Sequence, residues 1–317
     1  MLQRVEPHPR RFRFGVSVRA AESLDAWQAL ARKAEDLGFD ILHVADHLVD
    51  MFPPLTPLTA AAQATKRLRV GTLVLNNDFR HPAFVAREAA TIDLLTGGRF
   101  ELGLGAGHTA DEYASAGIAF DSAPVRVTRL EESVGILRRL LSGEEVSFDG
   151  EHYSLEAQRS FPMPSQRPLP LLVGGNGRRV LSIAARHADI VGFTGISHSP
   201  DGREASLRHL SERALSERIA IVSAAAGERF DALELNCLVQ SVVITDQLAP
   251  ALEAIAKRSP GIAPDALPNN PFLFVGAVDQ VVDELERRRE ELGVSYYVVF
   301  EHSMEALAPV IARLAGH

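Results

Sequence analysis

The sequence predicts a (β/α)8 TIM barrel that occupies the chain, residues 1–317, as a single domain. Short apolar runs of strand type alternate with longer segments of helical period, which is typical of parallel βαβ units. Eight strands can be counted at a regular pitch, which favours a closed barrel over the alternative, an open doubly wound sheet. The composition, 46% hydrophobic and 23% charged, is that of an ordinary globular protein.

Apolar runs bounded by turn residues define the strands, and apolar residues recurring on one face define the helices. The predicted strands are residues 12–18, 41–45, 68–75, 100–104, 171–173, 190–193, 233–243 and 296–300. The predicted helices are residues 23–38, 58–65, 83–95, 124–141, 178–187, 203–226, 247–257, 278–292 and 304–314. The first helix stops at Gly38, and the third begins after Pro82, a residue suited to the first turn of a helix.

Two segments break the alternation. Residues from about 142 to 170 carry prolines near their end and two short strand-like runs around Val146 and Tyr153, so we expect an insertion after the fourth βα unit. Residues from about 259 to 270 are rich in proline and have little pattern, and long loops of this kind are usually lids or binding segments.

Charge and composition exclude several classes of function. The net charge is −8 and no run of five or more like charges occurs, so we expect neither a nucleic-acid nor a membrane partner. No apolar run reaches the length of a membrane span and no signal-peptide pattern is visible, which predicts a cytoplasmic protein. The single cysteine, Cys237, lies in an apolar stretch and is expected to be buried. No metal-ligand spacing is found, so no metal site is predicted.

In a barrel of this kind, working residues lie where the strands end. Asp46 and His47 directly follow the second strand, and such a pair could contact a cofactor or transfer a proton, since histidine titrates near neutral pH. The alternative is an N-cap or loop pair that stabilises the next turn. His43, inside the strand, is expected to be structural.

Glycines mark two further strand ends. Gly103, Gly105 and Gly107, followed by His108, could let a flat ring or a phosphate approach the backbone, or could reflect close packing at the rim. They fit the dinucleotide pattern only loosely, and the acidic residue expected about 20 positions later in that pattern is missing, so we discount a Rossmann site.

The stretch Gly174-Gly175-Asn176-Gly177 lies between the fifth strand and a helix. Backbone N–H groups at a helix N-terminus form a phosphate site, to which Arg178 or Arg179 could add charge; a plain tight turn is the alternative. Phosphate sites in barrels more often follow the seventh and eighth strands. The residues alone thus indicate a barrel with a phosphate-bearing cofactor.

Taken in order, these motifs resemble those of luciferase-like monooxygenases. The most specific part runs from Thr72 to Pro82 and continues with Thr91-Ile92-Asp93 and Gly97-Gly98-Arg99, and it is similar to the deazaflavin-dependent oxidoreductases of actinobacterial type. The similarity extends over residues 12–314. It implies the deazaflavin coenzyme F420, with FMN as the alternative, a small-molecule substrate and a homodimer.

The resemblance also implies roles for individual residues. A bulge with a non-prolyl cis peptide at Leu73–Val74 would support the cofactor ring, Asp46 would contact its polar edge, and His47 would donate a proton near the substrate. The implied cofactor contacts are Asp46, Leu73, Val74, Asn76, Gly107, His108, Gly174, Gly175, Asn176 and Gly177, and the implied catalytic residues are His47, Asp46 and His108.

One departure bears on the substrate. Relatives that oxidise a sugar phosphate or an alcohol carry a glutamate where His108 aligns, and a tryptophan shortly after the Asp-His pair, where this chain reads residues 48–52 without one. We therefore expect a different substrate. Three functions remain: hydride transfer with F420, oxygen activation with reduced FMN, or cofactor binding without turnover, which the missing acidic group at position 108 suggests.

Overall fold

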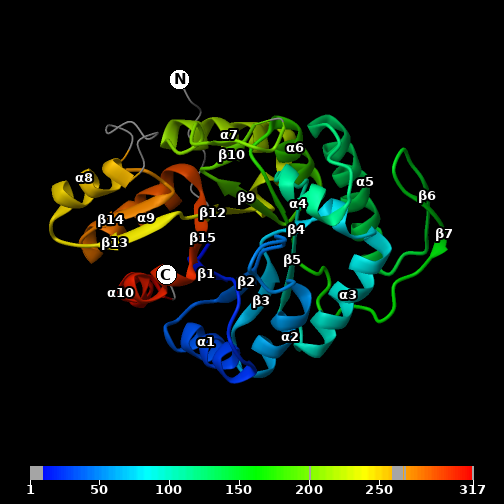
Figure 1. The fold of residues 1–317 in the computed structure, drawn as a ribbon, viewed down its shortest axis with the longest axis horizontal. Helices are drawn as coiled ribbons and strands as arrows, with labels where there is room; N and C mark the ends of the chain where they lie inside the picture. Colours follow the sequence, from blue (N-terminus) through cyan, green and yellow to red (C-terminus); the bar gives the residue numbers. More distant parts are fainter. Residues whose placement is uncertain (1–9, 200, 259–266, 268, 316–317) are drawn as a thin grey trace.

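A computed structural model describes residues 10–199, 201–258, 267 and 269–315 of the chain. The barrel strands are β1 (Arg13–Val18), β2 (Ile41–Val44), β3 (Arg69–Thr72), β4 (Leu75–Asn76), β5 (Phe100–Gly105), β8 (Leu171–Gly174), β9 (Ile190–Thr194), β12 (Glu234–Leu238) and β15 (Val294–Phe300). Their order is β3-β2-β1-β15-β12-β9-β8-β5-β4, and β3 also pairs with β5, which closes the sheet. Because β3 and β4 share one place, the described residues form an eight-stranded parallel barrel, as predicted (Figure 1).

Helices surround the barrel (Figure 1). They are α1 (Leu24–Asp36), α2 (Leu55–Gln63), α3 (Pro82–Leu95), α4 (Ala110–Ala116), α5 (Ala123–Ser142), α6 (Arg178–His187), α7 (Glu212–Ala226), α8 (Leu248–Arg258), α9 (Val278–Leu292) and α10 (Met304–Leu314). Local signals set their ends: Ser23 caps α1 by accepting from the amide of Ala26, and α5 ends at Gly143 in the left-handed region. The predicted bounds of α6, α9 and α10 are confirmed, whereas the short α4 was not predicted.

The third strand is interrupted where the sequence predicts one run, residues 68–75. The peptide bond Leu73–Val74 is cis, as the resemblance implied, and it separates β3 from β4. The neighbouring β5 must leave space for this bulge. A Cβ atom at Gly103 would lie 2.1 Å from the carbonyl oxygen of Thr72, and one at Gly105 would lie 2.7 Å from Val74. The glycines of β5 therefore serve close packing against the third strand.

Two predicted elements are wrong in part. The helix predicted for residues 203–226 begins only at Glu212, where Ser211 caps α7. The residues before it pair as a short antiparallel hairpin of β10 (Ser197–His198) and β11 (Ala205–Ser206). A left-handed turn at Gly202 closes this hairpin, and helical periodicity alone does not reveal such a turn.

The strand predicted for residues 233–243 is two strands. The barrel strand β12 ends at Leu238, and β13 (Ser241–Ile244) pairs in parallel with β14 (Leu273–Gly276), which was not predicted, in a separate sheet. These two strands, with α8 and α9, form the part of the molecule drawn in yellow and orange in Figure 1. Gln240 and Ser241 interrupt the apolar residues at this point, but two polar residues do not by themselves show that the chain leaves one sheet for another.

The predicted excursion, residues 142–170, contains β6 (Val146–Asp149) and β7 (Ser154–Gln158), which pair with each other apart from the barrel sheet (Figure 1). That this segment is an insertion into the family's barrel stays a prediction. Most of the predicted lid, residues 259–270, lies outside the described residues.

The barrel interior is polar at one end and apolar in the middle. Arg13, Arg69, Glu101 and Glu234 lie at the amino ends of their strands and form ion pairs with one another. Above them lies an apolar cluster, Ile41, Leu172, Ile190, Tyr296 and Val298, against which Leu73 and Val74 pack. The lower end is thus filled, and the carboxyl end is left to carry a site.

Candidate active site

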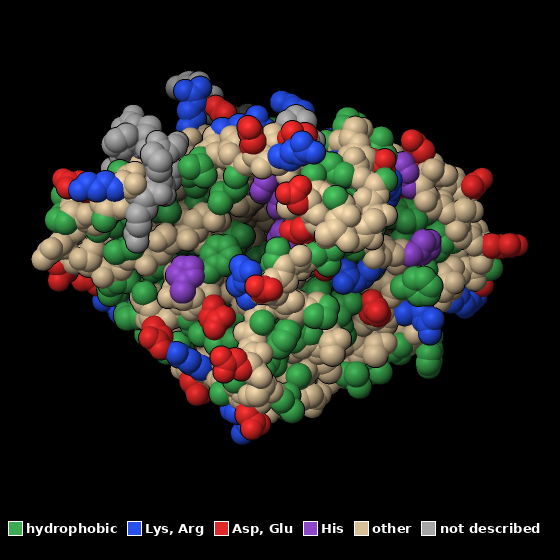
Figure 2. Space-filling model, viewed as in Figure 1, with side chains coloured by type: hydrophobic (Ala, Val, Ile, Leu, Met, Phe, Trp, Pro, Cys, Tyr) green, Lys and Arg blue, Asp and Glu red, His purple; other side chains and the backbone are tan. Residues whose placement is uncertain are grey.

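The carboxyl ends of the strands form a hollowed face. Figure 2 shows histidine side chains gathered at a hollow near the middle of this face. A pocket of about 700 Å³ lies where β1, β12 and β15 end, and it is lined in part by Ser17, Gln240 and Phe300. The sequence-predicted site residues are not among the residues that line this pocket.

Asp46 is held from two sides. Its carboxylate accepts a hydrogen bond of 3.0 Å from the backbone amide of Asn76, and both its oxygens contact the guanidinium of Arg80. The side chain is only 5% exposed. Asp46 thus joins the second strand to the third at the mouth, and Arg80, to which the sequence analysis assigned no role, fixes its orientation.

Asn76 lies beside the glycine-rich end of β5. Its side-chain oxygen accepts from the amide of Asp78 and from the hydroxyl of Tyr113, at 3.1 and 2.9 Å. Burial and the nearby Asp78 raise the pKa of Tyr113, so this hydroxyl stays protonated and donates. A Cβ at Gly107, whose φ is 73°, would lie 1.9 Å from the Tyr113 hydroxyl oxygen. Position 107 therefore requires glycine for two reasons: a side chain would collide with Tyr113, and the positive φ disfavours any other residue.

His47, His108 and His198 form a histidine cluster. The ring centroids of His47 and His108 are 5.4 Å apart, and those of His108 and His198 are 4.2 Å apart. His108 is exposed to solvent on one side, yet desolvation by the surrounding protein, with His198, His47 and Arg126 nearby, lowers its pKa. Desolvation, followed by His47, also lowers the pKa of His198.

A carboxylate meets this cluster at His47. The Nδ1 atom of His47 lies 2.8 Å from Oε1 of Glu112, and the other carboxylate oxygen accepts from the amide of Leu48 at 3.1 Å. Glu112 is 8% exposed and lies on α4. Position 108 itself carries no acidic side chain. The carboxylate near His47 comes instead from Glu112, four residues later, in the first turn of α4.

Val74 connects the third strand to the fifth. Its side chain lies 2.7 Å from the place of a Cβ at Gly105 and 3.3 Å from that at Gly174. The loop of residues 174–177 therefore begins directly beside the Leu73–Val74 bulge. The apolar side chains of Leu73 and Val74 thus lie next to the start of the loop that leads into α6.

The loop of residues 174–177 leads into α6 with Gly177 as its N-cap. The amide of Gly175 donates to the carbonyl of Gly192, so it is not free for a ligand. The amide of Leu181 donates to the carbonyl of Gly177, and the first amides of a helix, before that point, have no partner within the helix. These groups at the start of α6 can bind an anion.

The side chain of Asn176 points into the protein. Its amide nitrogen donates to the carbonyl of Ile196 at 2.9 Å, and its oxygen accepts from Arg218, which is 3% exposed. Burial lowers the pKa of Arg218 to about 10, which leaves it charged at neutral pH. Asn176 can thus reach a ligand only through its backbone. The guanidinium of Arg179 bonds to Glu131 of α5, and the suggestion that Arg178 or Arg179 adds charge to the loop stays a prediction.

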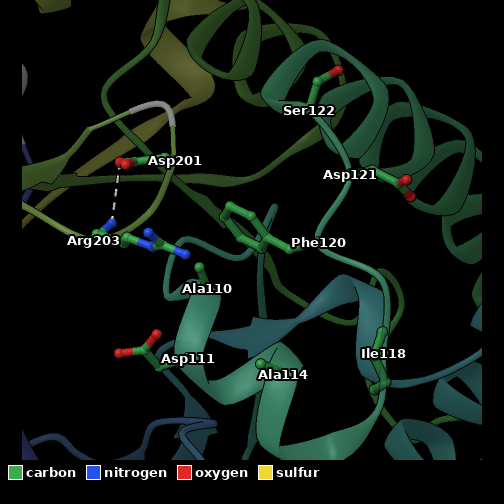
Figure 3. Close-up of a pocket in the computed structure, with 9 residues that line it drawn as sticks. All are labelled: Ala110, Asp111, Ala114, Ile118, Phe120, Asp121, Ser122, Asp201 and Arg203. Atoms are coloured by element: carbon green, nitrogen blue, oxygen red, sulfur yellow. Dashed lines mark hydrogen bonds between the residues drawn. The ribbon is translucent and has the colours of Figure 1, made fainter.

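A second pocket, of about 520 Å³, lies over α4 between the chain that follows this helix and the β10–β11 turn (Figure 3). Ala110, Asp111 and Ala114 line it from the helix, and Figure 3 shows the ring of Phe120 pointing into the space above them. Asp46, His47 and His108 are not among its lining residues. We treat it as separate from the candidate site.

Sequence reasoning did not single out Glu112, Arg80, His198 or Arg218. The rule that active residues follow barrel strands could have found His198, which comes four residues after β9 ends. Within the described ranges, no group of three or more histidine, cysteine or acidic residues could hold a metal ion. No described helix is long and apolar enough to cross a membrane.

Comparisons with known proteins agree with this arrangement. Residues 10–296 match the family described as luciferase-like monooxygenase. The chain is 35% identical over 167 residues to an F420-dependent glucose-6-phosphate dehydrogenase of Amycolatopsis mediterranei. It is 35% identical over 173 residues to the protein so named from Mycobacterium tuberculosis. Each match covers 50% of this chain and 50% of the relative, so the chain spans about half the length of the curated relatives it matches.

Two solved structures illustrate the likeness in fold. An F420-dependent secondary alcohol dehydrogenase in complex with an F420-acetone adduct superimposes with a TM-score of 0.76 and 20% identity, covering 96% of this chain and 99% of that one. A long-chain alkane monooxygenase superimposes with a TM-score of 0.76 and 17% identity, covering 96% and 91%. At such identities the likeness establishes the barrel fold.

Proposed function

Because the chain belongs to the luciferase-like monooxygenase family, we propose that it is an F420-dependent oxidoreductase. It transfers a hydride between the reduced deazaflavin and a small unsaturated or carbonyl-type organic molecule. The observation that supports the proposal is the closeness of Val74 to Gly174, where the loop that leads into α6 begins. A cofactor with a flat ring and a phosphate needs these two features next to each other.

The residues present fit such a cofactor. Leu73 and Val74 are partly buried and offer an apolar surface to one face of a ring. The first amides of α6 offer hydrogen bonds to a phosphate, and a Cβ at Gly177 would meet nothing within 4 Å, so space is left there. When bound, the deazaflavin supplies the hydride chemistry, and the protein supplies orientation and a proton.

Individual residues then take defined roles in the proposal. Asp46, held by Arg80 and by the amide of Asn76, accepts hydrogen bonds from the polar edge of the ring. His47 donates the proton near the substrate, and Gly107 and His108 line the ring or the tail. Binding the reactants side by side and excluding water accounts for much of the rate that a site of this kind can provide.

The experiment that tests the proposal is a pair of binding titrations of the purified protein, one with F420 and one with FMN. We expect F420 to bind more tightly. Tighter binding of FMN, together with oxygen consumption in the presence of a flavin reductase, would instead identify a reduced-flavin monooxygenase. Tight F420 binding without hydride transfer to any carbonyl or enone would identify a binding protein without turnover.

We also propose that the chain acts in the cytoplasm as a homodimer of single-domain subunits. Phe84, Leu94 and Leu95 on α3 are each more than half exposed, and exposed apolar side chains on one helix support contact with another protein surface. Sedimentation velocity should show a dimer for the wild-type protein and a monomer for the Phe84→Glu variant. A monomer in both cases would remove the dimer from the proposal.

A further inference from the structure

The pairing of His47 with Glu112 is the one contact between the histidine cluster and a carboxylate that the described residues show at hydrogen-bond distance. Both oxygens of Glu112 are used: one faces Nδ1 of His47 at 2.8 Å, and the other accepts from the amide of Leu48 at 3.1 Å. The carboxylate is nearly buried, with 9% of its side chain exposed. It therefore fixes both the ring of His47 and the backbone that follows it.

This contact sets the tautomer of His47. An ionised carboxylate only accepts hydrogen bonds, so Nδ1 must carry a proton. No hydrogen bond to Nε2 occurs within the described part of the chain, and 32% of the side chain remains exposed at the mouth. The atom that faces a ligand is therefore Nε2, while Nδ1–H stays on Glu112.

The other two histidines lack such a partner. Among the described residues, no carboxylate lies within hydrogen-bond distance of His108 or His198, whose rings pack against each other at 4.2 Å. Desolvation lowers the pKa of each, so both are neutral near pH 7. Neutral rings can line a ligand and accept or donate hydrogen bonds, but they are weak acids. Of the three rings, that of His47 is the one that contacts a carboxylate among the described residues.

We propose that Glu112 is a positioning residue that holds His47 as the proton donor of the site. The inference rests on the proposed function. The step starts from a His47 ring with a proton on each nitrogen: as a hydride reaches the carbon of a carbonyl substrate, the C=O π bond opens and the proton on Nε2 passes to the oxygen. His47 ends as a neutral ring whose Nδ1–H still points to Glu112. In the reverse direction, Nε2 takes the proton from the alcohol as the hydride leaves.

The first test needs no substrate. Long-range ¹H–¹⁵N spectra of protein labelled at histidine report which ring nitrogen carries the proton, and a His47→Asn variant assigns the signals of His47. We expect Nδ1 to be protonated in the wild type. In Glu112→Gln, one amide oxygen must serve two donors, and the NH2 group can donate to Nδ1, so the signals should move toward the Nε2–H tautomer. Identical signals in both proteins would overturn the proposal.

Asp111→Asn provides the matched control. Asp111 is the neighbour of Glu112 on α4, is exposed, and lines the separate pocket (Figure 3). This substitution removes the same charge from the same helix without touching His47, so the His47 signals should stay as in the wild type. If the His47 signals shifted equally in Asp111→Asn and Glu112→Gln, the effect of Glu112 would be one of net charge and not of direct contact, which would overturn the proposal. F420 affinity should be unchanged in Glu112→Gln, because Glu112 acts through His47.

A second test uses reduced F420 with cyclohex-2-enone as the hydride acceptor. Glu112→Gln should lower kcat about 10- to 100-fold with little change in KM, a part of what general acid catalysis contributes. In a His47→Asn background the same change should have no further effect; additive losses would overturn the proposal. If His47→Asn itself leaves the rate unchanged, or the wild type does not reduce the enone, the proposed function fails instead, and the spectra still decide the role of Glu112.

Discussion

The glycines of β5 determine how closely its neighbour can approach. A Cβ atom at Gly103 would lie 2.1 Å from the carbonyl oxygen of Thr72. We predict that Gly103→Ala lowers the free energy of unfolding by about 1–3 kcal/mol or more, because backbone cannot move aside as a side chain can. Gly135→Ala is the control: nothing lies within 4 Å there, and in the middle of α5 alanine should stabilise by about 0.5–1 kcal/mol. Urea denaturation measures both; equal effects would contradict the steric argument.

His43 gives the fold a pH dependence. It is buried in β2 with Nε2 2.5 Å from the hydroxyl of Tyr296, and burial lowers its pKa to about 4. The unfolded chain takes up this proton near pH 6.5 and the folded chain does not, so stability is complete above pH 6.5 and falls as the pH drops toward 4. The loss should be on the order of 1–3 kcal/mol. His43→Gln, which can still bond to Tyr296, should show a shallower decline in denaturation experiments at pH 7, 6 and 5; parallel curves would exclude His43 as the cause.

Single residues at strand ends could be predicted from the sequence, and their partners could not. Asp46 and His47 were found because they follow an apolar run, and the rule for barrels places such residues at the mouth. Glu112 contacts His47 across 65 positions of the chain. Arg80 contacts Asp46 across 34. No local pattern encodes such contacts, since they depend on how the strands and helices are arranged in space.

At the scale of elements, helices with clear ends were predicted best. Glycines in the sequence mark the start of Arg178–His187, which follows a glycine loop, and the end of Val278–Leu292, which is followed by Gly293 in the left-handed region. The errors arise where hydrophobic periodicity continues through a change of partner. Residues 233–243 carry apolar residues of strand type on both sides of Gln240 and Ser241, yet β12 pairs within the barrel and β13 pairs with β14.

The start of α6 permits a test of the anion site. Gly177 is the N-cap, has ordinary dihedral angles, and leaves room for a side chain. Gly177→Asp should not destabilise the protein, because aspartate is a good N-cap, but its carboxylate would take the amides and repel a phosphate. We expect F420 to bind at least about tenfold more weakly, equivalent to about 1.4 kcal/mol.

Two comparisons make the Gly177 experiment specific. Gly177→Ser is also a good N-cap but carries no charge, so it should retain most of the affinity. A phosphate-free deazariboflavin should bind the wild type and Gly177→Asp equally well in the same fluorescence titration. Should F420 bind Gly177→Asp as tightly as the wild type, the loop at residues 174–177 would no longer be part of the cofactor site.

The whole molecule separates the residues that hold the barrel together from those that line its mouth. Arg13 bridges Glu101 of β5 and Glu234 of β12, and its guanidinium lies 4.4 Å from the ring centre of Tyr296. Burial by itself would lower the pKa of Arg13, but Glu101 and Glu234 raise it well above its usual value. The cluster lies at the amino ends of the strands, the end that in barrels serves stability.

Removing Arg13 should therefore affect stability and leave the mouth unchanged. Arg13→Met leaves the nearly buried carboxylate of Glu234 without its cation and Glu101 with Arg69 alone, and we expect a loss of about 3–5 kcal/mol in the free energy of unfolding, measured with urea. Adding Glu234→Gln should recover much of it, because the carboxylate left without a cation is then gone, whereas Glu101 keeps its ion pair with Arg69. Arg11→Met, a change at an exposed neighbour, should have little effect. At temperatures where every variant is folded, F420 affinity should be the same in all of them; an affinity that falls together with stability would show that the two ends of the barrel are coupled.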